Sequence, residues 1–188
     1  MDETTLFAIA SKFAHKGGLS KAEWRDFIDG TSEKITIPEG VTNIRSYLFD
    51  GLNDVEGTLE IPDSVVTIGN YAFRGMGRID KLILGNSVSE IGNYAFSGML
   101  GLSGSITFPA AITKIGTYAF RYANNVDKLI FLGTPNSIST NAFNAADNIA
   151  DIYVPWEEDE VSGAPWGATY ATIHYGGTLN ENDQSVQI

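Results

Sequence analysis

Few residues of this chain have the types and the spacing that catalysis requires. Its two histidines, His15 and His174, have no Ser, Cys or carboxylate at the spacing of a recognisable catalytic motif. The glycine-containing stretch 75–78 is too short for a dinucleotide-binding loop, and no phosphate-loop signature is present. Cysteine is absent, which excludes disulfides and thiolate metal sites. We therefore expect no catalytic residues, no enzymatic activity and no cofactor.

One run of carboxylates, at residues 157–160, could bind a cation. Calcium-binding loops alternate their oxygen ligands around a central Gly, and this run has neither feature. We interpret it as a solvated loop and expect no metal site in the chain.

The charge of the chain is unevenly distributed. The formal net charge is −11; residues 1–128 contain 15 acidic and 12 basic residues, whereas residues 129–188 contain eight acidic residues and no Lys or Arg. A phosphate backbone or an anionic lipid surface would need cations opposite it. We therefore expect no nucleic acid partner, and because no apolar run reaches transmembrane length we expect no membrane insertion.

The strongest pattern in the sequence is a repeat that would position side chains. Phenylalanines recur at intervals of 24, 23, 24 and 23 residues, each at the end of a similar phrase such as Tyr71-Ala72-Phe73. They are Phe49, Phe73, Phe96, Phe120 and Phe143. Self-similarity at this period predicts a solenoid of stacked repeats, in which one repeat alone cannot bury a stable core.

Each repeat predicts the same local structure. An apolar residue, an intervening residue and a second apolar residue precede a Pro or another breaker, as in Leu59, Ile61 and Pro62, and this alternation predicts a short strand with one buried face. A second extended stretch, residues 65–68, ends at a Gly and is expected to turn into a short helical piece around residues 71–76. Identical repeats should stack their strands in parallel.

The phrase from Leu59 to Phe73, LEIPDSVVTIGNYAF, resembles the BspA-type, or treponemal-type, leucine-rich repeat. The resemblance covers residues 35 to about 154 and rests on Ile-Pro, Val-x-x-Ile-Gly and Ala-Phe. It implies an α/β fold: a right-handed leucine-rich repeat solenoid with a parallel β-sheet on one side and short strands or helical turns on the other. It also implies adhesion and protein binding by surface proteins. Where the family often has Cys, three residues after the Phe, this chain has Leu52, Met76, Met99, Ala123 and Ala146.

The extent of the repeat pattern divides the chain into four parts. Residues 1–31 are expected to form a short helical appendage, either a cap on the first repeat or a docking segment for an assembly. Residues 32–155 hold five leucine-rich repeats of 23–24 residues and a final strand, and residues 156–176 form a C-terminal cap with a closing strand near its end. This closing segment resembles those of leucine-rich repeat proteins encoded by tailed phages. Residues 177–188 are polar and are expected to be mobile.

The acidic start of the chain does not have the form of a signal peptide. We therefore interpret the chain as a virion component, as a fragment of an exported surface protein, or as a cytoplasmic protein, and leave these alternatives open.

A partner should bind the residues that project outward between the buried positions of the strands. The predicted partner-binding residues are Thr36, Glu60, Ile83, Thr107, Ile130 and Tyr153, with Lys81 and Lys128 beside them. They predict a non-enzymatic module that binds a protein or a cell-surface glycan in host attachment or adhesion by a phage or a bacterium. The alternative is a structural spacer or assembly subunit that the N-terminal helices anchor.

Overall fold

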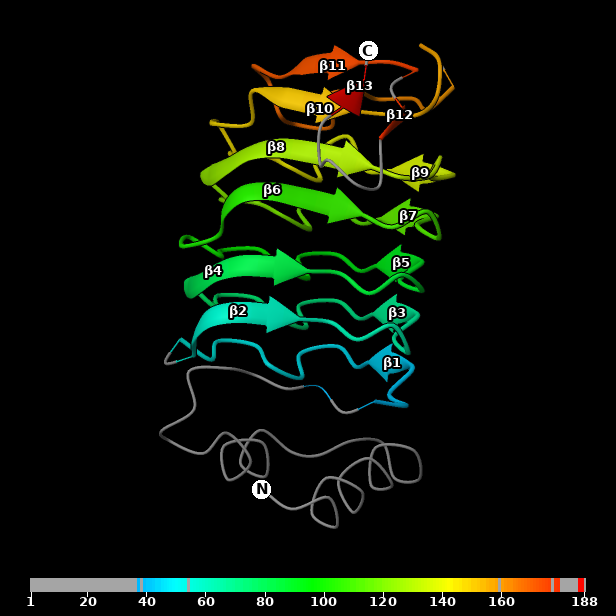
Figure 1. Cartoon of the computed structure of the whole chain (residues 1–188). Helices are drawn as coiled ribbons and strands as arrows, with labels where there is room; N and C mark the ends of the chain where they lie inside the picture. The colour runs from blue at the N-terminus through cyan, green and yellow to red at the C-terminus, as the bar shows by residue number, and fades with distance from the viewer. Residues whose placement is uncertain are drawn as a thin grey trace.

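The computed structural model describes residues 37, 39–53, 55–158, 160–176, 178–179 and 186–187. These residues form a β-solenoid whose successive turns, or rungs, stack along one axis (Figure 1). The predicted N-terminal helices, residues 1–31, lie outside the described residues, as does the predicted binding residue Thr36.

One side of the solenoid, here the long-strand face, carries one longer strand per rung. The strands are β2 (Glu56–Glu60), β4 (Arg78–Ile83), β6 (Ser103–Phe108), β8 (Asn125–Phe131), β10 (Asp151–Tyr153) and β11 (Thr172–His174). All pairs are parallel, as the repeat predicts; β2 pairs with β4, and β6, β8, β10 and β11 form a second ladder. Burial alternates along β6, because every second side chain points into the core.

A second side, the short-strand face, carries a five-stranded parallel sheet of two-residue strands. They are β1 (Asn43–Ile44), β3 (Thr67–Ile68), β5 (Glu90–Ile91), β7 (Lys114–Ile115) and β9 (Ser137–Ile138). The second residue of each strand is an Ile, these isoleucines pair in register, and all are buried. The predicted short strands opposite the main sheet are thereby confirmed.

On the third side of the solenoid, here the turn face, the predicted short helical piece is absent from the described residues. Residues 71–76 form turns, not a helical piece, and no segment of the described chain is helical, so the fold there is β and the expected α/β class is not supported. The reason lies in the backbone hydrogen bonds. Amides of Tyr71, Phe73 and Gly75 donate to carbonyls of the next rung at 2.8–2.9 Å. A helix would use these amides within its own turn, and Tyr71 has a left-handed φ of 59°.

The core is a stack of identical columns. The five repeating phenylalanines are fully buried, and consecutive rings stack with centroids 5.0–5.4 Å apart.

The alternation of the repeat length between 23 and 24 residues also has a structural cause. The longer intervals contain Gly57 or Gly104, both with positive φ, and the strand ladder shifts its register beside each of them. An extra residue is thus accommodated as a bulge on the long-strand face without displacing the core.

The far end of the described solenoid is closed by two buried tryptophans. The rings of Trp156 and Trp166 lie 5.3 Å and 5.8 Å from the ring of Phe131 in the last long rung. The indole N–H of Trp166 donates to the carbonyl of Ser162 at 3.0 Å. The closing strand predicted near residues 171–175 is β11, which pairs with β10. Beyond it, β12 (Thr178–Leu179) and β13 (Val186–Gln187) pair antiparallel, and the mobility of this tail stays a prediction.

Candidate binding surfaces

The long-strand face carries the residues that the sequence predicts to bind a partner. Glu60, Lys81, Ile83 and Thr107 are exposed, as alternation along the strands requires. Ile130 is only 7% exposed, so the expectation that it projects into solvent is wrong. In the sheet its neighbours in register are Thr107 and Tyr153, each one strand spacing, roughly 4.8 Å, away.

The predicted residues fall into two separate groups on this face. Glu60 and Ile83 line a hollow of about 560 Å³ together with Leu84 and Asn86. Lys128 and Tyr153 meet at the other end of the sheet, where the Lys128 ammonium lies 5.5 Å from the centre of the Tyr153 ring. The structure therefore does not bring the predicted set together as one site.

The group at the C-terminal end includes two residues that sequence reasoning did not assign. The ring of His174 stacks on the ring of Tyr153, with centroids 4.4 Å apart. His174 Nε2 lies 2.7 Å from Asp151 Oδ1. An imidazole oriented by a carboxylate is the arrangement of a general base, but within residues 37–176 as described no hydroxyl hydrogen-bonds to this imidazole. The register of the strands could have revealed the pair, since positions 151 and 174 lie on neighbouring strands.

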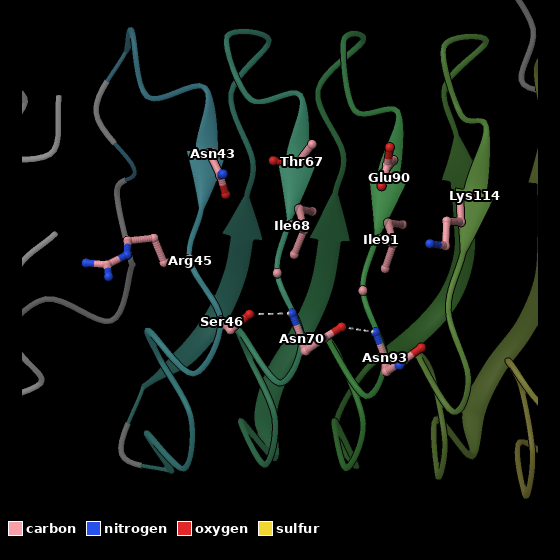
Figure 2. A pocket seen from close by; sticks show the side chains of 12 residues that line it. Asn43, Arg45, Ser46, Thr67, Ile68, Asn70, Glu90, Ile91, Asn93 and Lys114 are labelled. Atoms are coloured by element: carbon pink, nitrogen blue, oxygen red, sulfur yellow. Dashed lines mark hydrogen bonds between the residues drawn. The ribbon is translucent and has the colours of Figure 1, made fainter. Parts of the chain in front are cut away.

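The short-strand face is hollowed into a groove of about 670 Å³ that runs across β1, β3, β5 and β7. Figure 2 shows its side chains, among which the first residue of each strand points outward. These residues are Asn43, Thr67, Glu90 and Lys114. Sequence reasoning missed this groove, although a polar residue that changes in every repeat, beside a constant Ile, was a visible signal.

The floor of the groove is built by hydrogen bonds from rung to rung. The Asn70 amide donates to Ser46 Oγ at 3.1 Å, and the Asn93 amide donates to Asn70 Oδ1 at 2.8 Å (Figure 2). The Thr117 amide continues the series by donating to Asn93 Oδ1 at 2.9 Å. These bonds satisfy backbone groups between the strands and hold the groove in one shape.

The turn face carries a ladder of tyrosines. Rings of Tyr47, Tyr71, Tyr94 and Tyr118 follow one another with centroids 4.7–5.1 Å apart, and all four residues have positive φ. Two arginines lie against this tyrosine ladder. Arg74 lies 4.8 Å from the centre of the Tyr71 ring, and Arg121 lies 5.0 Å from that of Tyr118. Sequence reasoning used these tyrosines only as markers of the repeat.

The two arginines differ in their charge environment. Nε and a terminal nitrogen of Arg74 donate to the two carboxylate oxygens of Asp50, at 2.8 Å and 2.9 Å. This bidentate hydrogen bond raises the pKa of Arg74 above its ordinary value. Arg121 contacts a second ring, that of Tyr122 at 4.4 Å, and its Nε is buried without a hydrogen-bond partner.

Among the described residues, no cluster of three or more His, Asp or Glu side chains has the geometry to hold a metal ion. Over the same residues, no helix is long and apolar enough to cross a membrane.

Parallel strands that recur every 23–24 residues over stacked Ile and Phe columns define a leucine-rich repeat solenoid. The chain belongs to the BspA type leucine-rich repeat family, whose model matches residues 53–162 in six copies. No curated protein matches the chain significantly.

The chain is similar to several solved structures. The leucine-rich repeat protein of T. pallidum is 22% identical, with a TM-score of 0.61 over 77% of this chain and 69% of that one. A leucine-rich repeat protein of Bacteroides ovatus is 24% identical, with a TM-score of 0.42 over 61% of this chain and 35% of that one. A leucine rich cell surface protein of Faecalibacterium prausnitzii is 20% identical, with a TM-score of 0.40 over 64% and 47%. The treponemal likeness supports the fold.

Proposed function

We propose that this chain is a non-enzymatic recognition module that binds a protein or a glycan, in host attachment or adhesion at the surface of a bacterium or a phage. One observation carries the proposal: on the short-strand face the inward position is the same in every rung, whereas the outward position changes in every rung. On the short-strand face the inward column is Ile throughout. The outward column is Asn43, Thr67, Glu90, Lys114 and Ser137. Because the buried isoleucines supply the packing that the fold needs, the exposed residues can differ between rungs and can specify a partner.

The groove on the short-strand face suits a polar partner. It is lined by charges of both signs, from Arg45, Glu90 and Lys114, and by the carboxamides of Asn43 and Asn93. Carboxamides both donate and accept hydrogen bonds, which fits peptide groups and sugar hydroxyls. Its shallow form across several rungs favours an extended ligand over a small substrate.

The distribution of acidic groups supports a binding role over hydrolysis. Glycoside hydrolysis needs a pair of carboxylates that face each other across the bond to be cleaved. The groove contains a single carboxylate in its lining, that of Glu90. The His174–Asp151 pair lies on the long-strand face, on β10 and β11, away from this groove.

The test compares two matched variants that neutralise or remove outward side chains without touching the core. The groove variant is Glu90→Gln with Lys114→Gln, and the long-strand variant is Ile83→Ser with Tyr153→Ser. Ile130 is left intact because it is buried. Binding of the intact chain to a glycan array and to purified cell-envelope proteins should be lost in one variant and retained in the other, with both melting near the wild type. Equal binding by all three proteins, or no binding by the wild type, would contradict the proposal.

The alternative role, a spacer or assembly subunit, depends on residues 1–31, which lie outside the described residues. It stays a prediction. Light scattering on the chain with and without residues 1–31 tests it, because an assembly subunit should be oligomeric only when they are present.

A further inference from the structure

The turn face contains two copies of one arrangement, two rungs apart. Arg74 and Arg121 are separated by 47 residues and occupy equivalent positions, each against the ring of the tyrosine three residues before it. The position that carries Asp50 in the first copy carries Ser97 in the second, 47 residues later. The second copy has therefore kept the arginine and lacks its carboxylate.

In the first copy the guanidinium is already satisfied. Arg74 donates from Nε and a terminal nitrogen to the two oxygens of the Asp50 carboxylate. This parallel two-bond geometry is the one that a guanidinium forms best with a planar carboxylate. Arg74 thus shows, within this fold, which group an arginine at this position binds.

In the second copy the guanidinium lacks such a partner. Arg121 Nε is buried and makes no hydrogen bond, and within the part of the chain that the structure describes no carboxylate lies within ion-pair distance of Arg121. Buried polar groups are nearly always hydrogen-bonded, and each exception calls for an explanation. A carboxylate from outside the described chain would approach the guanidinium through its terminal nitrogens, which, unlike Nε, are not buried without a partner.

The surroundings of Arg121 hold it in place for such a partner. Its guanidinium lies over the rings of Tyr118 and Tyr122, at 5.0 Å and 4.4 Å from their centres. At the position of Tyr122 the first copy has Gly75, so the second ring contact is specific to the second copy. Two ring contacts restrict the rotamers of the side chain, which lowers the entropy lost when it binds.

We propose that Arg121, held by Tyr118 and Tyr122, is a binding site for a carboxylate side chain of a protein partner. The proposal deepens the recognition role proposed above and rests on it. A protein is favoured over a neutral glycan because the guanidinium already occupies a face of each of the two rings at this site. It is favoured over a polyanion because the chain carries a net charge of −11. Tyr and Arg are also the residues that dominate binding energy in protein interfaces.

The experiment measures the binding of a small molecule with one carboxylate to Arg121. The intact ¹⁵N-labelled chain is titrated with N-acetylglutamate N-methylamide, and the Arg121 Nε–H signal is followed by NMR at constant ionic strength. N-acetylglutamine N-methylamide is the uncharged control. We expect saturable binding with a dissociation constant on the order of 10 mM for the glutamate probe, and binding weaker by about tenfold for the glutamine probe.

Three variants make the test specific. Arg121→Lys keeps the positive charge but loses the planar pair of N–H donors that a guanidinium offers to a carboxylate, and should weaken binding by about tenfold. Tyr122→Gly restores the residue of the first copy at a position with positive φ, so it should keep the fold and weaken binding. Asp50→Ser should release Arg74 and create a second saturable site for the same probe.

Other outcomes overturn the assignment. Equal shifts with the glutamate and glutamine probes, or unchanged binding by Arg121→Lys, would show that the site does not read a carboxylate. Tighter binding of inorganic phosphate would assign the site to a different oxyanion. The test is independent of the groove variants above: if they abolish macromolecular binding while the probe does not bind at Arg121, only the present inference fails. If the probe binds and no macromolecule does, only the proposed recognition role fails.

Discussion

Replacing Gly92 with Ala tests how closely the rungs are packed. Gly92 directly follows β5, and a Cβ built on it would lie 2.7 Å from the backbone nitrogen of Asn70 and 2.7 Å from the carbonyl carbon of Gly69. Both contacts are with the backbone of the preceding rung, so no side chain can rotate away. Either the two rungs separate or the hydrogen bond from the Gly92 amide to the Ile68 carbonyl, now 2.8 Å, is lost.

The expected cost follows from these two effects. Overpacking costs about 1–3 kcal/mol, and one or two lost hydrogen bonds at about 0.5–1.5 kcal/mol each bring the total to roughly 1.5–6 kcal/mol. The matched control is Gly104→Ala. Gly104 has a φ of 70° and no atom within 4 Å of its hypothetical Cβ, so alanine there should cost only the left-handed backbone penalty, about 1–2 kcal/mol.

The assay is urea unfolding followed by circular dichroism, with hydrogen exchange on the same proteins. Gly92→Ala should lower the free energy of unfolding more than Gly104→Ala does, and should deprotect the amides of residues 92 and 93 while amides of distant rungs keep their protection. Equal losses for the two variants, or a loss below about 1 kcal/mol for Gly92→Ala, would refute the close-packing argument.

Three further predictions concern the core and the surface. Phe96→Ala should lower the free energy of unfolding by about 3–5 kcal/mol, because the ring is fully buried; melts that coincide with the wild type would contradict this. Ile130→Ala should cost about 2–5 kcal/mol, whereas Ile83→Ala at a 39% exposed position should cost under about 1 kcal/mol, and the reverse order in urea unfolding would contradict the placement of the two residues. Asp50→Asn should cost at most about 1 kcal/mol because its partner Arg74 is partly exposed, and the loss should shrink in 1 M salt; a salt-independent loss would argue against the ion pair.

The core and the stacking of the strands could be predicted from the sequence because they depend on columns that every repeat shares. The Phe column and the Ile column each mark one inward position, and identical repeats can superpose only with parallel strands. The turn face could not be predicted in the same way. Ala72, Phe73 and Met76 have the spacing of a helical face. The amides of Tyr71, Phe73 and Gly75, however, donate to carbonyls of the next rung, and that partner is invisible within a single repeat.

The predictions of surface residues also succeeded where they depend on a single strand and failed where they depend on other parts of the chain. Alternation predicted the exposure of Glu60, Ile83 and Thr107, because it depends only on the strand itself. It failed at Ile130, which occupies an outward position of its strand, pairs in register with Tyr153 and is nevertheless buried. Tyr122, which contacts Arg121, has a left-handed φ of 66°. The glycines at the equivalent positions of earlier rungs signal that angle, but no residue pattern signals the ring contact with Arg121.

The two-rung period explains why departures from the repeat are informative here. Features that the fold needs recur 47 residues apart: Gly57 recurs as Gly104, and the tyrosine rings recur with them. Two departures, Ser97 for Asp50 and Tyr122 for Gly75, fall around the same arginine. With Ser97 in place of the aspartate but no Tyr122, the Arg121 guanidinium would be unpaired but loosely held. With Tyr122 but an aspartate at position 97, it would be held but already neutralised. Together they leave a guanidinium that is held by its neighbours and unpaired within the described chain, which is what recognition of an external carboxylate requires.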